Sequence, residues 1–172
     1  MADDHVSMKG RIVMQQCMSA RLQVKPPTNE EEAECVEVKR GVVIYICFLR
    51  KADVSIVEKM AKAVLTVRLC PASQNGKLVS ILDLPGDVLI VPQSTLGGKA
   101  KGKMIQYHSN IDKAKGVELY HAFIEQCQKM LGENAKWKQA GCALRHGTYG
   151  IRQEVLRFDT DARGPFCHYF EF

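Results

Sequence analysis

Residues 41–49, GVVIYICFL, constrain the fold more than any other segment, because they form an unbroken run of β-branched, aliphatic and aromatic residues. A run without polar alternation suits a β-strand that is buried on both faces. The chain has 172 residues, of which 46% are hydrophobic, and no Pro/Gly/Ser-rich linker divides it. Such a chain can bury one sizeable core, so we expect residues 1–172 to form a single domain.

Two amphipathic helices are predicted beside this strand. Apolar residues recur at helical spacing in residues 52–69 and 116–132, and either a Ser55–Glu58 capping box or Asp53 would begin the first helix. Strands are expected at residues 10–18, 20–25, 78–82, 88–91, 151–158 and 165–172. The predicted fold class is α/β, a single domain whose antiparallel or mixed β-sheet forms a barrel-like core with two amphipathic helices packed against it.

Charge and cysteine content limit the partners and the compartment. The net charge of +5 is compatible with an anionic partner without requiring one. The seven cysteines are an odd number without a C-x-x-C pair, and the first residues, MADDHVSMKGR, carry no apolar signal segment. We therefore expect a reducing compartment, the cytoplasm or the nucleus. No apolar stretch approaches the roughly 18 residues of a membrane span, so no membrane partner is expected.

Histidines and cysteines offer neither a metal site nor a nucleophile in the sequence. Cys142 and His146 have a spacing that some zinc sites use, but no second pair completes the site. Cys167 and His168 are adjacent, so on a strand they would point to opposite faces. We expect no metal, no cofactor and no catalytic thiolate–imidazole pair.

Two apolar segments end in unusual polar or backbone-rich interruptions. The strand at residues 88–91 runs into Pro92 and then into Gln93, Ser94 and Thr95, which we call the shelf. The following GGKAKGK suits a flexible basic loop on a phosphate backbone, although a solvated surface loop has the same composition; its lysines are Lys99, Lys101 and Lys103. Near the end of the chain, Gly164–Pro165 interrupts the predicted closing strand. A plain turn is the alternative interpretation of this pair.

These interruptions resemble the two motifs of the D-aminoacyl-tRNA deacylase family. PQSTL at residues 92–96 resembles the family's S-Q-F-T-L, or P-Q-A-T-L in its animal-specific branch. ARGPFCH at residues 162–168 resembles N-x-G-P-x-T, or T-N-G-P-Y-T-H in that branch, and keeps Gly164, Pro165 and His168. Arg163, Phe166 and Cys167 depart from this second motif. Supporting matches in GVVIYICFLRKAD, KAVLTVRL and GTYG extend the resemblance along nearly the whole chain.

The resemblance implies a homodimer that hydrolyses the ester between an amino acid and the terminal ribose of a tRNA. The family uses no side-chain nucleophile. Instead, the ribose 2′-hydroxyl activates water, and bare main-chain N–H groups at Gln93, Ser94 and Thr95 stabilise the oxyanion, with a further contact from the Thr95 hydroxyl. The expected partners are the aminoacylated 3′ end of tRNA and a second copy of the chain, without DNA, and Lys99, Lys101 and Lys103 are expected to bind tRNA phosphates.

Gly164–Pro165 corresponds to the part of the family site that selects the chirality of the substrate, with Phe166 and His168 beside it. In the parent branch the Gly-Pro peptide is cis and excludes L-amino acids, whereas in the animal branch it is trans and the pocket is wider. Gln16 stands where the parent has an arginine that packs on this pair, and Arg152 is expected to supply the missing contact.

The animal branch implies activity on L-alanyl-tRNA(Thr), with D-aminoacyl-tRNA as a second substrate class. Three alternatives remain at this point. The chain could be a strict D-aminoacyl-tRNA deacylase, a non-catalytic tRNA-binding module that uses its basic charge, or a scaffold protein. The sequence contains no aromatic stacking motif of the RRM type, which disfavours the second, and a scaffold would give no reason for the shelf.

Overall fold

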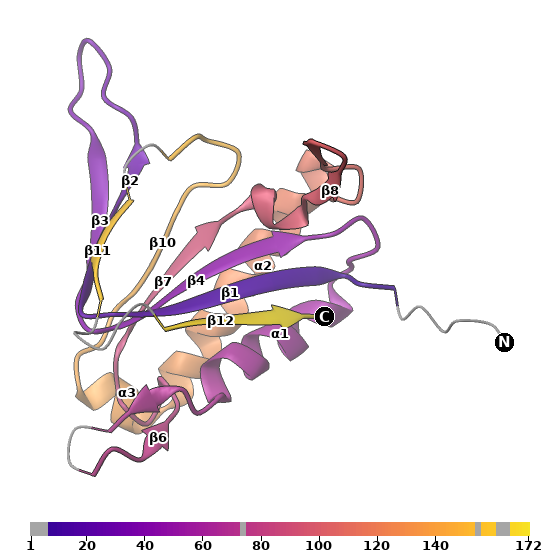
Figure 1. Ribbon diagram of the computed structural model, residues 1–172. Coiled ribbons are helices and arrows are strands. Elements are labelled where there is room, and N and C mark those ends of the chain that lie inside the picture. The colour runs from indigo at the N-terminus through magenta and orange to yellow at the C-terminus, as the bar shows by residue number, and fades with distance from the viewer. Residues whose placement is uncertain (1–6, 73–74, 154–155, 161–165) are drawn as a thin grey trace, which may run out of the picture.

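The structure is a computed structural model that describes residues 7–72, 75–153, 156–160 and 166–172. Its elements follow one another along the chain (Figure 1) as β1 (Gly10–Cys17), β2 (Ser19–Lys25), β3 (Glu34–Val38), β4 (Gly41–Phe48), α1 (Ser55–Thr66), β5 (Cys70–Pro71), β6 (Leu78–Val79), β7 (Asp87–Pro92), the 3₁₀ helix η1 (Ser94–Gly97), β8 (Lys99–Lys101), β9 (Met104–Gln106), α2 (Lys113–Glu133), α3 (Ala135–Gln139), β10 (Leu144–His146), β11 (Leu156–Asp159) and β12 (Cys167–Glu171).

Strand β4 lies at the centre of a five-stranded mixed sheet with the order β10-β7-β4-β1-β12. It runs parallel to β7 on one side and antiparallel to β1 on the other. Every residue of β4 except Tyr45 is buried, which confirms the expectation of burial on both faces. The strand begins at Gly41, where a Cβ would lie 1.8 Å from the Asp87 carbonyl oxygen, so that β4 and β7 can approach closely only with glycine there.

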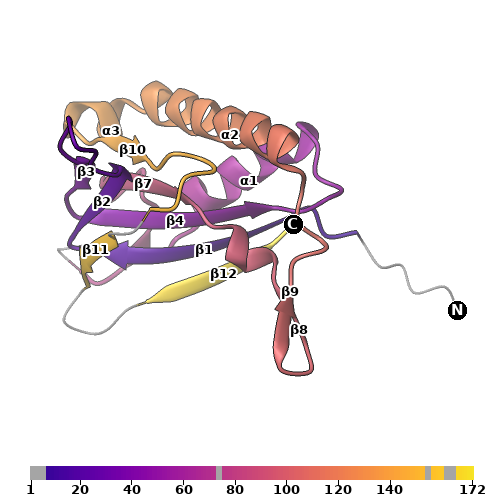
Figure 2. The ribbon, with the colours of Figure 1, turned by 90° about the horizontal axis from the view of Figure 1, so that it is seen from above.

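Helices α1 and α2 cover one face of this sheet (Figure 2). The buried residues of α1 are those of the apolar pattern, Ile56, Val57, Met60, Ala61, Val64 and Leu65. At the start of the helix, Oδ1 of Asp53 accepts the Ser55 N–H at 2.9 Å, so Asp53 satisfies a donor of the first turn. Both predicted helices are confirmed, and burying each large aliphatic side chain contributes about 1.5–3 kcal/mol.

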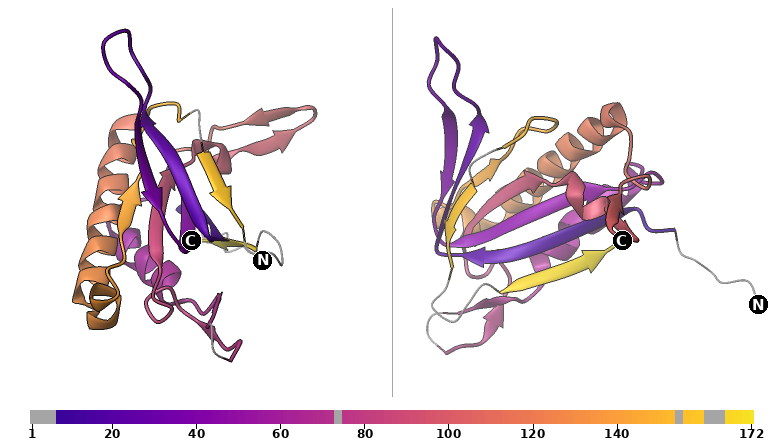
Figure 3. Two further views of the ribbon diagram at one scale, coloured as in Figure 1. Left: turned by 90° about the vertical axis from the view of Figure 1, so that its left-hand side faces the viewer. Right: turned by 45° about the horizontal axis from the view of Figure 1, so that its top comes forward.

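A three-stranded sheet, β11-β2-β3, covers one end of the opposite face (Figure 3). Leu22 and Val38 of this sheet pack against Val43, Leu89 and Val91 of the five-stranded sheet. The sheets do not close into a full barrel, because among the described residues β10 and β12 remain the outer strands of the larger sheet. The mixed α/β architecture is as expected, and only the barrel-like closure is not found.

The basic segment after the shelf forms a hairpin, and the expectation of a flexible loop is wrong. Strand β8 pairs with β9 from Lys99↔Gln106 to Lys101↔Met104, and Gly102 enters the turn with φ +61°. The antiparallel pairing of β8 with β9 fixes the backbone of the lysine-rich stretch. The hairpin projects from the sheet on the side away from α2 (Figure 2).

Candidate active site

The shelf begins where the pairing of β7 ends. Pro92 is the last residue of β7 paired with β4, opposite Ile46, and the Gln93 N–H donates to the Ile46 carbonyl oxygen at 2.9 Å. The expectation that the Gln93 N–H is bare is therefore wrong, because this amide extends the parallel ladder by one bond. Residues 94–97 then turn into η1, which lifts the chain out of the sheet.

The two following amides remain without acceptors. Ser94 and Thr95 are the first residues of η1, and the first N–H groups of a helix have no partner within it. Among the described residues no carbonyl oxygen accepts the N–H of Ser94 or Thr95, and both residues are exposed. Adjacent backbone donors without acceptors are the kind of group that stabilises an oxyanion.

Side chains within the shelf contact each other. Nε2 of Gln93 donates to Oγ1 of Thr95 at 2.6 Å. The Thr95 hydroxyl thus acts as an acceptor and keeps its own proton available for a ligand. The expected hydroxyl contact from Thr95 is compatible with this geometry, with Gln93 as the residue that orients the hydroxyl.

A cavity of about 480 Å³, which we call the ester pocket, opens beside the shelf. Its walls come from the end of β4, from the start of α2 and from the GTYG segment at residues 147–150. The hydroxyl of the buried Tyr120 donates to the Gly147 carbonyl oxygen at 2.7 Å and so ties this segment to α2. The side chains that shape the pocket beside Gln93 and Ser94 include Cys47, Asn110, Lys113, Tyr149 and Arg152.

The side chain of Asn110 fixes the backbone of η1. Its Nδ2 donates to the Ser94 carbonyl oxygen at 2.9 Å, and the side chain packs directly on Gly97. A Cβ at Gly97 would lie 1.6 Å from Oδ1 of Asn110, so no other residue fits there while Asn110 keeps this position. Oδ1 of Asn110 is buried and has no partner among the described residues.

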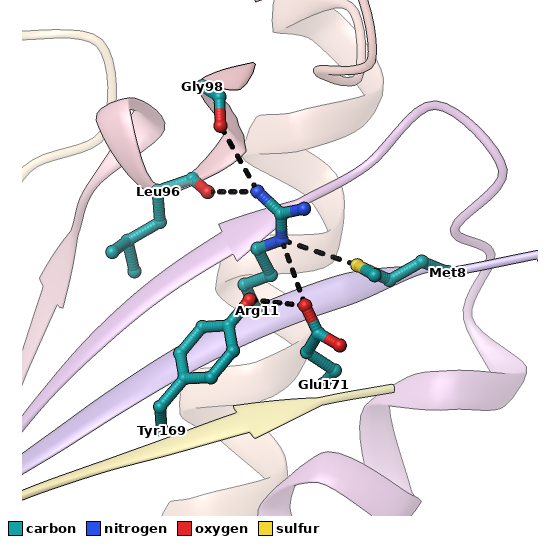
Figure 4. Close-up of polar contacts among 6 residues, drawn as sticks. All are labelled: Met8, Arg11, Leu96, Gly98, Tyr169 and Glu171. Carbon is teal, nitrogen blue, oxygen red and sulfur yellow. Dashed lines mark hydrogen bonds and ion pairs between the residues drawn. The ribbon is translucent and has the colours of Figure 1, made fainter. Parts of the chain in front are cut away.

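Arg11 of β1 holds the C-terminal end of η1 (Figure 4). Its Nη1 donates to the carbonyl oxygens of Leu96 at 2.8 Å and of Gly98 at 3.3 Å. Nε of Arg11 lies 3.6 Å from Oε1 of Glu171, which also accepts the Tyr169 hydroxyl. Asn110 and Arg11 therefore hold the carbonyl groups of Ser94, Leu96 and Gly98, so that side chains from two other segments fix η1.

The thiol nearest the shelf is not a nucleophile. Sγ of Cys47 lies 3.8 Å from the Ser94 carbonyl oxygen, to which it donates. Burial raises the pKa of this thiol to about 11, so it stays neutral at pH 7. Burial likewise raises the pKa of Cys127 to about 12. Within the described residues no group of three or more His, Cys, Asp or Glu side chains could hold a metal ion.

The residues predicted to select chirality separate into two places. Arg152 lines the ester pocket, whereas Gln16 lies on β1 opposite Val42, several residues along the sheet from the shelf. The Gln16 N–H donates to the Phe166 carbonyl oxygen at 3.4 Å, so Phe166 lies at the same distant end. His168 pairs with Met14, and its Nδ1 is buried without a partner among the described residues. Gly164 and Pro165 lie outside the described residues.

Sequence patterns did not indicate the residues that support the shelf. Arg11, Cys47 and Asn110 each come from segments that read as ordinary strand or loop, and only the fold brings them to η1. Tyr149 belongs to the GTYG match, whereas no sequence pattern indicated Lys113. The signal that could have found Asn110 is Gly97, because a glycine at a strand end often marks the close approach of another group.

The fold and this pocket place the chain in the class of aminoacyl-tRNA deacylases. A solved structure described as a probable eukaryotic D-amino acid tRNA deacylase superposes with a TM-score of 0.78 at 27% identity, covering 96% of this chain and 100% of that one. The family model for D-Tyr-tRNA(Tyr) deacylase matches residues 13–171. The chain belongs to this family, whose members hydrolyse the ester bond of aminoacyl-tRNA.

Animal relatives match over nearly the whole length. D-aminoacyl-tRNA deacylase 2 of Gallus gallus is 54% identical over 94% of this chain and 95% of its own length. The Homo sapiens protein of the same name is 48% identical over 100% of both chains. Among the described residues no helix is both long enough and apolar enough to cross a membrane.

Proposed function

We propose that this chain hydrolyses the ester of D-aminoacyl-tRNA and of L-alanyl-tRNA(Thr), with the ester bound in the pocket beside the shelf. The observation that carries the mechanism is the pair of N–H groups at Ser94 and Thr95 that no described carbonyl accepts. An ester carbonyl oxygen directed at these donors becomes negatively charged when water attacks, and fixed amides stabilise that charge without reorganisation.

The attacking water needs a base, and the neutral thiol of Cys47 does not supply one. The substrate carries a 2′-hydroxyl next to its ester, and this hydroxyl activates the water in the mechanism that we propose. Thr95, with its hydroxyl proton free to donate, orients the reacting group. Lys113 and Arg152 at the pocket wall add positive charge where the oxyanion forms.

Acceptance of a small L-amino acid is supported by the environment of Gln16. Its Nε2 donates to the Leu69 carbonyl oxygen at 2.7 Å, so the side chain is engaged away from Phe166. Gln16 replaces the arginine that packs on a cis Gly-Pro peptide in the parent branch, and cis X-Pro bonds are already disfavoured by about 0.5–1 kcal/mol. A trans peptide would leave room for the methyl group of L-alanine.

We further propose that the active form is a homodimer. Gln16 pairs with Val42 of β4 and donates its N–H to Phe166, whereas the shelf follows Pro92, which pairs with Ile46 of β4. Four residues of an extended strand span roughly 14 Å, which separates the two motifs within one copy. A second copy can bring its Gly-Pro segment to the shelf of the first, and Tyr169, 54% exposed on β12, offers apolar surface for such an interface.

Removing one backbone donor tests the oxyanion site directly. Ser94→Pro deletes an N–H that no protein group accepts, at the first helical position, where proline is tolerated. Gln93, with φ −137° and ψ 83°, lies outside the α region that a following proline disfavours. We expect kcat to fall by about 10²–10³ with little loss of stability, whereas the matched Ser94→Ala variant keeps its activity. Equal activity in the two variants contradicts the proposed oxyanion site.

A panel of three substrates tests specificity. We expect cleavage of L-alanyl-tRNA(Thr) and of D-aminoacyl-tRNA, with correctly charged L-threonyl-tRNA(Thr) left intact because its branched side chain is larger. Cleavage of D-alanyl-tRNA with L-alanyl-tRNA untouched would instead make the chain a strict D-aminoacyl-tRNA deacylase. Binding of all three without turnover would favour a tRNA-binding module.

A further inference from the structure

A second cavity, of about 410 Å³, adjoins the last residue of η1, whereas the ester pocket adjoins its first residue. Ser94 lines the ester pocket and Gly97 lines this second cavity, while the bridge between Leu49 and Asn110 runs between them. The second cavity is rich in cationic and hydrogen-bonding side chains, and we call it the basic cavity. Its polar lining includes Arg11, Arg50, Lys51, Lys99, His108 and Ser109.

Within the part of the chain that the structure describes, few carboxylates compensate the positive charge of the basic cavity. Lys9, nearby on the chain, is paired with Asp53 at 3.0 Å, and Arg11 lies 3.6 Å from Glu171. In contrast, no carboxylate of the described residues lies within ion-pair distance of Arg50, Lys51 or Lys99. Like charges that converge without counterions lower the stability of the empty cavity and favour an anionic ligand.

The cavity walls are ordered without a ligand. The Arg50 N–H donates to the Ser109 carbonyl oxygen at 2.7 Å, and its Nη2 donates to the His108 carbonyl oxygen. Nη1 of Arg11 is held by the carbonyl groups of Leu96 and Gly98. Guanidinium groups that are already oriented lose little entropy when they bind a tetrahedral oxyanion.

The position of the cavity relative to the ester pocket identifies the anion. A 3₁₀ helix rises about 2 Å per residue, so η1 separates the shelf from Gly97 by roughly 6 Å. This distance is similar to the spacing of successive nucleotides along an extended single strand of RNA. A substrate whose terminal ribose ester sits at Ser94 therefore carries its nearest backbone phosphates past Gly97.

We propose that the basic cavity is a phosphate-binding subsite, in which Arg50, Lys51 and Lys99 hold a backbone phosphate of the tRNA acceptor strand while the aminoacyl ester occupies the ester pocket. This inference rests on the proposed function. It assigns a role to Arg50 and Lys51, which lie outside the hairpin and outside both motifs. It also makes η1 a single rigid element that sets the distance between phosphate and ester.

The test compares a substrate that has phosphates with one that lacks them. Lys51→Glu reverses the charge of an exposed side chain that makes no ion pair with another described residue, and Arg50→Gln/Lys51→Gln removes two charges. Lys59→Gln/Lys62→Gln removes two charges from the exposed side of α1 and is the matched control. Each variant is assayed on L-alanyl-tRNA(Thr), on D-aminoacyl-tRNA and on the corresponding 3′-aminoacyl-adenosines.

We expect the cavity variants to raise KM for aminoacyl-tRNA by about tenfold or more, with kcat unchanged and with aminoacyl-adenosine cleaved at the wild-type rate. The salt dependence of tRNA affinity should weaken by about 1.4 in slope for the double variant, since each lost contact with a single strand contributes roughly 0.7. The control should behave as wild type. Equal effects on both substrates, or none on either, would overturn the subsite.

Binding of uncharged tRNA tests the phosphate-binding subsite independently of ester hydrolysis. Unchanged affinity of Lys51→Glu for uncharged tRNA overturns the subsite, whether or not the wild type hydrolyses esters. Reduced affinity in a chain whose wild type cleaves no ester supports the subsite and overturns the proposed function. Inorganic phosphate should compete with tRNA in the wild type. A cavity that binds inorganic phosphate while its variants keep full tRNA affinity would overturn the assignment to the acceptor strand.

Discussion

Replacing Arg11 by methionine should slow hydrolysis without touching the substrate ester. The change keeps an unbranched apolar stem and removes the guanidinium that donates to the carbonyl oxygens of Leu96 and Gly98. Without these bonds the C-terminal end of η1 loses its fixed position, and the Ser94 and Thr95 N–H groups lose their alignment. Arg11 is thus a positioning residue, and its effect should appear in kcat.

The size of the effect follows from the contacts. The 2.8 Å bond to Leu96 has a charged donor and contributes about 1.5–3 kcal/mol, whereas the 3.3 Å contact lies beyond the usual range and adds little. The pair with Glu171 is half-exposed and contributes about 0–1 kcal/mol. A loss of about 2 kcal/mol in the transition state lowers kcat roughly 30-fold. The same loss in folding lowers Tm by about 4–8 °C.

Aminoacyl-adenosine is the substrate for this assay, because it lacks the phosphates that the basic cavity would bind. Arg11→Lys should recover part of kcat, since an ammonium group can donate to one carbonyl oxygen but not in the planar geometry of arginine. Arg21→Met is the control, because it removes an equally charged side chain that is paired with Glu37 on an exposed strand. A normal kcat in Arg11→Met, accompanied by a lowered Tm, would refute positioning and leave only a stabilising role.

Three further predictions concern the cysteines, the hairpin and pH. Cys127→Ala and Cys142→Ala should each leave the chemical step within about tenfold of wild type, and a thousandfold loss in a folded variant would reveal a nucleophile. Neutralising Lys99, Lys101 and Lys103 together should raise KM for aminoacyl-tRNA and reduce the salt slope by roughly three at most, with kcat little changed; an unchanged slope would mark a surface hairpin without a role. Burial raises the pKa of Cys127 from 9.0 to about 12, so its contribution to stability is present below pH 9 and is lost as pH rises through that window. Urea unfolding at pH 7 and pH 10 should show a smaller difference for Cys127→Ala than for wild type.

The periodicity of the sequence was sufficient to predict the central strand and both long helices. Residues 41–49 contain no polar alternation, and the apolar positions of α1 are the ones that are buried. Short strands such as β3 and β10 escaped prediction because their few apolar residues carry no clear period, and their pairing partners are distant in the sequence. Tertiary pairing decides such segments, and local propensity does not.

The candidate site was predictable only in part. The small polar residues after Val91 indicated the shelf. The sequence could not show that the Gln93 N–H donates to the Ile46 carbonyl oxygen. That bond depends on the register between β4 and β7, which no local pattern specifies. Arg11 was equally unpredictable, because an arginine on a strand is typical of the surface, and its contact is with η1, which follows β7, a strand that β4 separates from β1.

The contact between Gly97 and Asn110 limits how the site can change by mutation. A side chain at position 97 collides with Asn110, and shrinking Asn110 first releases the carbonyl group of Ser94. Each single step therefore passes through a damaged enzyme, although a paired change could restore packing. The two positions are expected to behave epistatically in a mutational scan, so that lineages descending from this chain inherit glycine and asparagine together or abandon them together.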